Sequence, residues 1–248
     1  MGPLSFRPGQ FVSFRIGTDD LGNAMMRSYS IASLPEEPEL RLILRTILDG
    51  KASAFFAALP IGGEAMFTGP MGFFVNELSH PGDVVYVATG TGIAAIFPML
   101  RETLLRPEAS RVYLLWGLRC EADVFWEGEL LALQTQHPRF SFHVYLSKPQ
   151  GPWPDTQRGR VLSPLLALLP SLSHATFYLC GNGHMIEDAK ATLVAQGIPR
   201  KRQIRTEAFF DETHITPSRE LVRAGLRGQA RRTWFSQVRE GGTAATTD

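Results

Sequence analysis

The residues best suited to bind a phosphate lie at Gly90–Ala95, in the sequence GTGIAA. They directly follow the apolar run Asp83–Ala88 and open a helical pattern over Ile93–Leu105. Paired glycines between a strand and a helix permit a tight turn, bring the backbone close to a pyrophosphate and meet its charge with the helix N-terminus. An ordinary tight turn is the alternative for this motif alone. We predict nucleotide binding by Gly90, Thr91 and Gly92.

Basic residues follow the next two expected strands. An acidic residue that binds a ribose 2′-hydroxyl usually ends the strand corresponding to Arg111–Trp116, but Arg119 is found there instead. Lys148 follows the third expected strand. Positive charge suits a 2′-phosphate better than a free diol, so the pattern favours NADPH without excluding NADH. The alternative is that Arg119 pairs with Glu121 or Asp123.

A second group of candidates lies on an expected strand in the first part of the chain, at RSYS. Alternation places Arg27 and Tyr29 on one side of that strand and Ser28 and Ser30 on the other. Considered alone, this motif is typical of an edge strand with a surface arginine.

The sequence DGKAS, Asp49–Ser53, leads into the helical run Ser53–Leu59. Ser53 is expected at the capping position, where the first turn offers free N–H groups to a phosphate. A Gly/Pro turn with two aromatic residues, Gly69–Phe74, then ends this half of the chain.

The elements that must position these residues differ between the two halves. The first half predicts an all-β barrel or sandwich with one inserted helix, with strands at Gln10–Ile16, Ser28–Ala32, Glu39–Ile47 and Glu64–Thr68. The second half alternates apolar strands with helices, which predicts βαβ units and a parallel sheet. Its expected strands are Asp83–Ala88, Arg111–Trp116, Phe140–Leu146, Thr176–Cys180 and Gln203–Thr206. Its expected helices are Ile93–Leu105, Asp123–Thr135, Leu162–Leu169 and Met185–Gln196.

Composition excludes several classes of protein. The 248 residues carry 25 basic and 24 acidic side chains, so net charge gives no case for a nucleic-acid partner. Two cysteines, Cys120 and Cys180, are too few for an iron–sulfur cluster or a cysteine-rich zinc site, and no metal is expected. No apolar run reaches about 18 residues, and no signal segment opens the chain. A cytoplasmic protein without a membrane span is expected.

Seven motifs at sensible spacing resemble the ferredoxin–NADP reductase superfamily: PGQF, RSYS, DGKAS, GPMGFF, GTGIAA, CGNGHM and TEAFF. The resemblance covers Ser5–Phe210 and is to the branch of bacterial ferredoxin reductases and oxygenase reductase components, without their iron–sulfur domain. It implies an antiparallel β-barrel that binds FAD in residues 1–80 and an α/β parallel-sheet domain that binds NAD(P) in 81–210. Residues 211–248 are expected to be a tail, partly helical or disordered.

The same resemblance implies roles for the motif residues. Arg27 would contact the flavin pyrophosphate, Tyr29 would stack on the isoalloxazine and Ser30 would lie near its N5, with Ser28 in the same motif. Gly50, Lys51, Ala52 and Ser53 would hold the pyrophosphate. The second nucleotide would be held by Gly90, Thr91, Gly92, Arg119, Lys148, Cys180, Gly181 and Met185.

Three residues are implied in catalysis: Ser30, Cys180 beside the nicotinamide, and Glu207 near the flavin edge. Relatives carry at least one barrel strand before PGQF, so the first strand is expected to be missing and Phe11–Ile16 to be an exposed edge. FAD is favoured over FMN by the resemblance.

The resemblance implies hydride transfer from NAD(P)H to FAD and single-electron transfer, in either direction, with a ferredoxin or another iron–sulfur or flavodoxin-type acceptor. One alternative is a quinone or free-flavin acceptor; another is a nucleotide-binding regulatory protein with an incomplete flavin barrel. A monomer is expected. An acidic ferredoxin would be steered by a basic surface, for which the candidates are Arg200, Lys201, Arg202 and Arg205, unless that run is only a solvated face.

Overall fold

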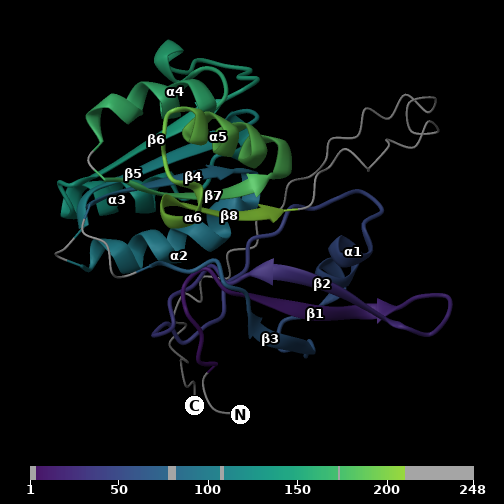
Figure 1. The fold of residues 1–248 in the computed structure, drawn as a ribbon. Coiled ribbons are helices and arrows are strands. Elements are labelled where there is room, and N and C mark those ends of the chain that lie inside the picture. Colours follow the sequence, from purple (N-terminus) through teal and green to yellow (C-terminus); the bar gives the residue numbers. More distant parts are fainter. Residues whose placement is uncertain (1–3, 78–81, 107–108, 173, 210–248) are drawn as a thin grey trace, which may run out of the picture.

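The computed structural model of the chain describes residues 4–77, 82–106, 109–172 and 174–209. Two sheets organise these residues, one antiparallel with three strands and one parallel with five (Figure 1). This arrangement confirms the predicted order of an antiparallel domain followed by an α/β domain with a parallel sheet. The expected tail, 211–248, and residues 78–81 at the expected domain boundary lie outside the described residues.

The antiparallel sheet belongs to the N-terminal part and has the strand order β2-β1-β3. Alternation along β1 buries Val12, Phe14 and Ile16. Phe14 meets Phe56 of the single helix with ring centroids 5.4 Å apart, so this helix packs on the sheet. The elements of this part are β1 (Phe11–Thr18), β2 (Ala24–Ser30), α1 (Lys51–Ala58) and β3 (Phe67–Met71).

The prediction that Phe11–Ile16 forms an edge is wrong. Phe14 lies opposite Arg27 of β2 on one side and opposite Phe67 of β3 on the other, so β1 is the central strand. The sequence indicated a strand at Glu64–Thr68, close to β3, but it did not indicate that this strand pairs with the side of β1 that was expected to be open.

The expected strand Glu39–Ile47 is also wrong. Among the described residues it makes one isolated bridge, between Leu42 and Ile31, and no ladder. Its first residues are engaged otherwise: the Arg41 guanidinium binds the Glu37 carboxylate, and both hold the chain outside the sheet. The segment is extended without being a strand.

The start of α1 differs from the prediction as well. The N-cap residue is Gly50, not Ser53, because the helix begins at Lys51. The Ser53 hydroxyl accepts a hydrogen bond from the Ile47 N–H at 2.8 Å, so it closes the loop before the helix instead of capping it.

The parallel sheet has the strand order β6-β5-β4-β7-β8, with a crossover helix between successive strands. One apolar core lies between the sheet and α2 and α3, and a second lies between the sheet and α4 and α5. The strands are β4 (Gly82–Thr89), β5 (Ala109–Leu118), β6 (Phe140–Leu146), β7 (Thr176–Asn182) and β8 (Ile204–Phe209). The helices are α2 (Ile93–Leu104), α3 (Glu127–Gln136), α4 (Leu162–Leu168), α5 (Gly183–Ala195) and α6 (Arg200–Gln203).

Every expected strand and helix of this domain is present, but the helix predicted over Asp123–Thr135 begins later. Asp123 ends a short 3-10 turn, and Trp126 has a φ of 59°, in the left-handed region. The chain therefore changes direction before α3 starts at Glu127.

The two parts meet where the chain enters the parallel sheet. Phe74 packs in the core of the second domain, with its ring centroid 6.0 Å from that of Tyr178. The buried Asn76 amide donates hydrogen bonds to the Met99 carbonyl at 2.8 Å and to the Glu102 carboxylate at 2.7 Å, both on α2. These contacts fix the end of the N-terminal part against β7 and α2 of the second domain.

An ionic contact joins the same two parts. The Glu37 carboxylate binds both Arg41 and Arg101, the latter on α2. Burial would raise the pKa of Glu37, but the hydrogen bonds and charges of the two guanidiniums hold that pKa below its ordinary value. Glu37 therefore stays charged at neutral pH.

Candidate functional site

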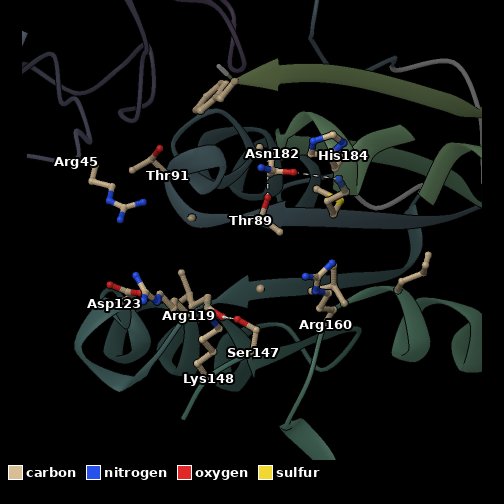
Figure 2. A pocket seen from close by; sticks show the side chains of 18 of the residues that line it. Arg45, Thr89, Thr91, Arg119, Asp123, Ser147, Lys148, Arg160, Asn182 and His184 are labelled. Atoms are coloured by element: carbon tan, nitrogen blue, oxygen red, sulfur yellow. Dashed lines mark hydrogen bonds between the residues drawn. The ribbon is translucent and has the colours of Figure 1, made fainter. Parts of the chain in front are cut away.

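A cavity of about 610 Å³ opens at the carboxyl ends of β4, β5, β6 and β7, where open parallel sheets bind their ligands. Figure 2 shows Arg119, Ser147 and Lys148 on one wall and Thr89, Asn182 and His184 on the other. Of the residues predicted to bind the second nucleotide, the cavity is lined by Gly90, Thr91, Arg119, Lys148, Gly181 and Met185.

Gly92 of the turn and Gly181 of β7 pack too closely for a side chain. A Cβ on Gly92 would lie 2.4 Å from the Cys180 carbonyl oxygen, and one on Gly181 would lie 2.3 Å from the Thr89 hydroxyl oxygen. That hydroxyl also accepts a hydrogen bond from the Asn182 N–H at 2.9 Å. The end of β7 is thereby packed tightly against the turn after β4.

The N-terminus of α2 faces this cavity without a capping side chain. Its first N–H groups and the macrodipole favour an anion there. The turn packs closely against β7, and no side chain caps the helix that follows it. Both features fit a dinucleotide pyrophosphate.

Cationic side chains line the far wall of the cavity. Arg119 and Lys148 come from neighbouring loops, and the Lys148 N–H donates to the Arg119 carbonyl at 2.7 Å. The Glu121 carboxylate, which the sequence offered as a partner for Arg119, accepts the N–H groups of Gln150 at 3.0 Å and Gly151 at 2.7 Å. These bonds lower the pKa of Glu121 and tie the two loops together.

Among the lining residues that the sequence reasoning missed are Arg45, Arg160, Asn182 and His184. Arg160 follows Gly159 before an apolar helical run, a pattern too common to indicate a ligand. Arg45 lies in the segment that was expected to be a strand, and Figure 2 shows it extending towards the cavity from the N-terminal part. Only Asn182 had a usable signal, as a residue with a capping side chain directly before a helix.

The predicted flavin residues come together on β2 and α1. The Tyr29 ring meets Phe56 edge to face, with centroids 5.2 Å apart, which places α1 beside β2. Arg27, two residues before Tyr29, is exposed on the same side of the strand, and Ser28 is exposed on the other.

The loop before α1 fits a phosphate group. A Cβ on Gly50 would lie 3.1 Å from the Ile47 carbonyl oxygen and 3.2 Å from the Ser53 hydroxyl oxygen, so glycine permits the tight approach. No side chain caps α1, so the N–H groups of Lys51 and Ala52 are available to an anion.

The three predicted catalytic residues lie in different surroundings. Ser30 is buried at the end of β2. Cys180 is fully buried in β7, between Ala88 and Glu207 of the neighbouring strands, and it is Gly181, the next residue, that lines the cavity. Burial, with a smaller effect from Glu207, raises the pKa of the Cys180 thiol well above its ordinary value. Burial also raises the pKa of Glu207. Their catalytic roles stay predictions.

Within the described ranges, no three histidine, cysteine, aspartate or glutamate side chains gather in a way that could hold a metal ion. None of the helices that the structure describes is long and apolar enough to cross a membrane.

Two family models match the two parts of the chain. An oxidoreductase FAD-binding domain matches residues 2–76, and an oxidoreductase NAD-binding domain matches residues 86–191. These matches coincide with the antiparallel part and with the parallel sheet that carries the cavity. The chain belongs to the ferredoxin–NADP reductase superfamily.

Individual members of the superfamily support this assignment. The ferredoxin–NAD(P)+ reductase component of the naphthalene dioxygenase/salicylate hydroxylase systems of Ralstonia is 29% identical over 84% of this chain. Ferredoxin–NADP reductase B of Sorangium cellulosum is 29% identical over 79% of the chain. A ferredoxin NADP+ reductase from Neisseria gonorrhoeae, solved with FAD and NADP, superposes with a TM-score of 0.72 at 25% identity, covering 85% of this chain and 89% of that one.

The chain is shorter than some superfamily members. It spans 62% of the length of the Ralstonia protein and 82% of that of the Sorangium protein.

Proposed function

We propose that the protein is a flavoenzyme that moves a hydride between NAD(P)H and bound FAD and exchanges single electrons with a ferredoxin-like protein. The observation that carries this proposal is the coenzyme cavity, with its glycine turn, uncapped helix and cationic wall, beside an FAD-binding domain. The similar proteins from Ralstonia and Sorangium are named as ferredoxin reductases.

The chain's own residues bind and orient in this proposal. A bound flavin supplies what amino acids lack, the ability to accept a hydride and release electrons singly. Arg27 and the N–H groups at Lys51 and Ala52 hold the flavin phosphates, and Tyr29 covers the ring. Ser30 would donate a hydrogen bond at N5, and the small, buried Cys180 would leave room beside Gly181 for the nicotinamide.

The cationic wall supports NADPH as the preferred coenzyme. Arg160 joins Arg119 and Lys148 in the cavity, which gives three positive side chains that can face a 2′-phosphate. Arg119→Ala should remove roughly 1.5–3 kcal/mol of charge-assisted binding to NADPH. Turnover with NADH should change little. Equal losses with both coenzymes would contradict this assignment.

An acidic iron–sulfur or flavodoxin-type protein is the proposed electron partner. Arg200 and Lys201 on α6 are exposed and support such a docking surface. Arg205 contributes less, because its guanidinium binds the Glu77 carboxylate and the Lys201 carbonyl. The proposed location is the cytoplasm, a reducing compartment, which suits a chain with two cysteines that are both buried.

The test begins with the visible spectrum of the purified protein supplied with FAD, followed by anaerobic titration with NADPH. The proposal expects a flavin spectrum that NADPH bleaches, and cytochrome reduction that rises when a [2Fe–2S] ferredoxin is added. A protein that binds no flavin would favour the regulatory alternative. A protein whose turnover responds to quinone and not to ferredoxin would favour the quinone alternative.

A further inference from the structure

A residue outside the nucleotide motif donates a hydrogen bond to the glycine turn. The indole N–H of Trp116, on β5, donates a hydrogen bond of 3.0 Å to the Gly90 carbonyl oxygen. Trp116 is completely buried and does not line the coenzyme cavity, whereas Gly90 and Thr91 do. The bond therefore reaches the turn from the interior of the protein.

This bond fixes the direction of one peptide group. In a planar trans peptide the C=O and the following N–H point in opposite directions. Because the Gly90 carbonyl points inward to Trp116, the Thr91 N–H points outward, to the side on which the cavity lies. Gly90 has a φ of 55°, in the left-handed region, so this peptide orientation is one that other residues rarely adopt.

The Trp116 ring is itself held in place. Phe125 packs against it edge to face, with ring centroids 4.8 Å apart. Trp116 is fully buried in the core between the sheet and α2 and α3, where close packing restricts the movement of its ring. A rigid donor that holds a peptide plane is a preorganised support for an anion site.

We propose that Trp116 is a positioning residue for the coenzyme pyrophosphate: its indole N–H holds the Gly90–Thr91 peptide so that the Thr91 N–H faces the phosphate. This inference rests on the proposed function only for the identity of the coenzyme. The pyrophosphate is common to NADH and NADPH, so the support acts equally on both and not on the 2′-phosphate.

The test compares Trp116→Phe with the parent by calorimetry, using two probes. ADP carries the pyrophosphate, whereas 2′-AMP carries a 2′-phosphate and no pyrophosphate. Trp116→Phe keeps an aromatic ring and removes the donor, so ADP binding should weaken roughly 3–10-fold, as expected for loss of one hydrogen bond. Binding of 2′-AMP should stay within about twofold, because its contacts lie on the other wall.

A matched control is Trp153→Phe, because the Trp153 indole also donates to a backbone carbonyl, that of Val144 at 3.4 Å, away from the turn. It should leave ADP binding unchanged. In turnover, Trp116→Phe should raise KM for NADH and NADPH by the same factor and leave kcat nearly constant, a split that general loosening of the domain does not produce.

Three results would overturn the inference: unchanged ADP binding in Trp116→Phe, equal weakening of ADP and 2′-AMP, or a parent that does not bind ADP. If the unmodified protein binds ADP but neither coenzyme reduces bound flavin, the proposed function is refuted. The role of Trp116 is then still decided by comparing ADP binding in the unmodified protein and in Trp116→Phe.

Discussion

Replacing Tyr86 by phenylalanine tests how the two domains are joined. The Tyr86 hydroxyl is fully buried and lies 2.7 Å from the Asn76 side-chain oxygen, 2.8 Å from the Thr103 hydroxyl and 3.2 Å from the Met99 carbonyl oxygen. Asn76 belongs to the segment that leads out of the FAD-binding domain. The tyrosine therefore fixes the junction from inside the nucleotide domain.

The expected loss follows from which partners can be satisfied without the hydroxyl. Thr103 lies four residues after Met99 on α2 and can turn its proton to the Met99 carbonyl, as threonines in helices do. The Asn76 side-chain oxygen has no comparable substitute and is left buried without its donor. One unsatisfied buried acceptor costs about 1–3 kcal/mol, so the Tyr86→Phe variant should be less stable by that amount.

Urea unfolding followed by tryptophan fluorescence measures this loss in the relevant domain. Trp116, Trp126 and Trp153 all belong to the nucleotide domain, while Trp234 lies outside the described residues. With a slope of about 2 kcal/mol/M, the midpoint should fall by about 0.5–1.5 M. Tyr145→Phe is the control, because the Tyr145 hydroxyl makes no hydrogen bond that the described residues show.

The reasoning fails if Tyr86→Phe and Tyr145→Phe shift the midpoint equally, since the loss would then belong to any buried tyrosine. A changed slope with an unchanged midpoint would also contradict it, because the variant would have altered the unfolded ensemble.

Three further predictions follow from other contacts. Ser30→Ala should keep bound flavin but slow its reduction by NAD(P)H about 10²-fold in stopped-flow measurements, as expected for loss of one aligned donor; an unchanged rate would refute its placement at N5. Glu37 has a lowered pKa in the folded protein, so it stabilises the fold above its unfolded pKa and that contribution disappears as pH falls through the folded value. The urea midpoint should therefore depend less on pH in the acid range in Glu37→Gln, and an unaltered dependence would exclude Glu37 as its source. Glu121→Ala should raise KM for NADPH more than KM for NADH, because the loop that carries Lys148 loses its carboxylate support; parallel changes would show that the loop does not affect selectivity.

The sequence predicted the features that depend on neighbours in the chain. The turn at Gly90–Gly92 needs only its own glycines, the strand before it and the helix after it, so the motif indicated both its shape and its use. Arg119 and Lys148 were predicted because the carboxyl ends of parallel strands meet at one edge of the sheet.

What the sequence did not predict depends on pairings between distant residues. Trp116 lies in an apolar run typical of a buried strand, and nothing near it in the sequence indicates that its N–H meets Gly90 in the turn after β4. Arg160 joins the cationic wall only because Arg158 and Gly159 bond back to the end of β6, at Leu146. The position of β1 in the sheet required a partner that follows α1.

Residues 39–47 alternate like a strand, but in the structure part of this segment lines the coenzyme cavity. It is held at one end by the Glu37 ion pairs and leads at the other into the loop before α1. Between these ends, Leu44, Arg45 and Thr46 line the coenzyme cavity. Ladder pairing on both sides would have drawn this backbone into the sheet and away from the nucleotide domain. Leu40 and Leu42 of this segment pack on the core of the antiparallel part, and the residues that follow them contribute to the coenzyme cavity. The coenzyme cavity therefore depends on the contacts that hold the FAD-binding domain in place.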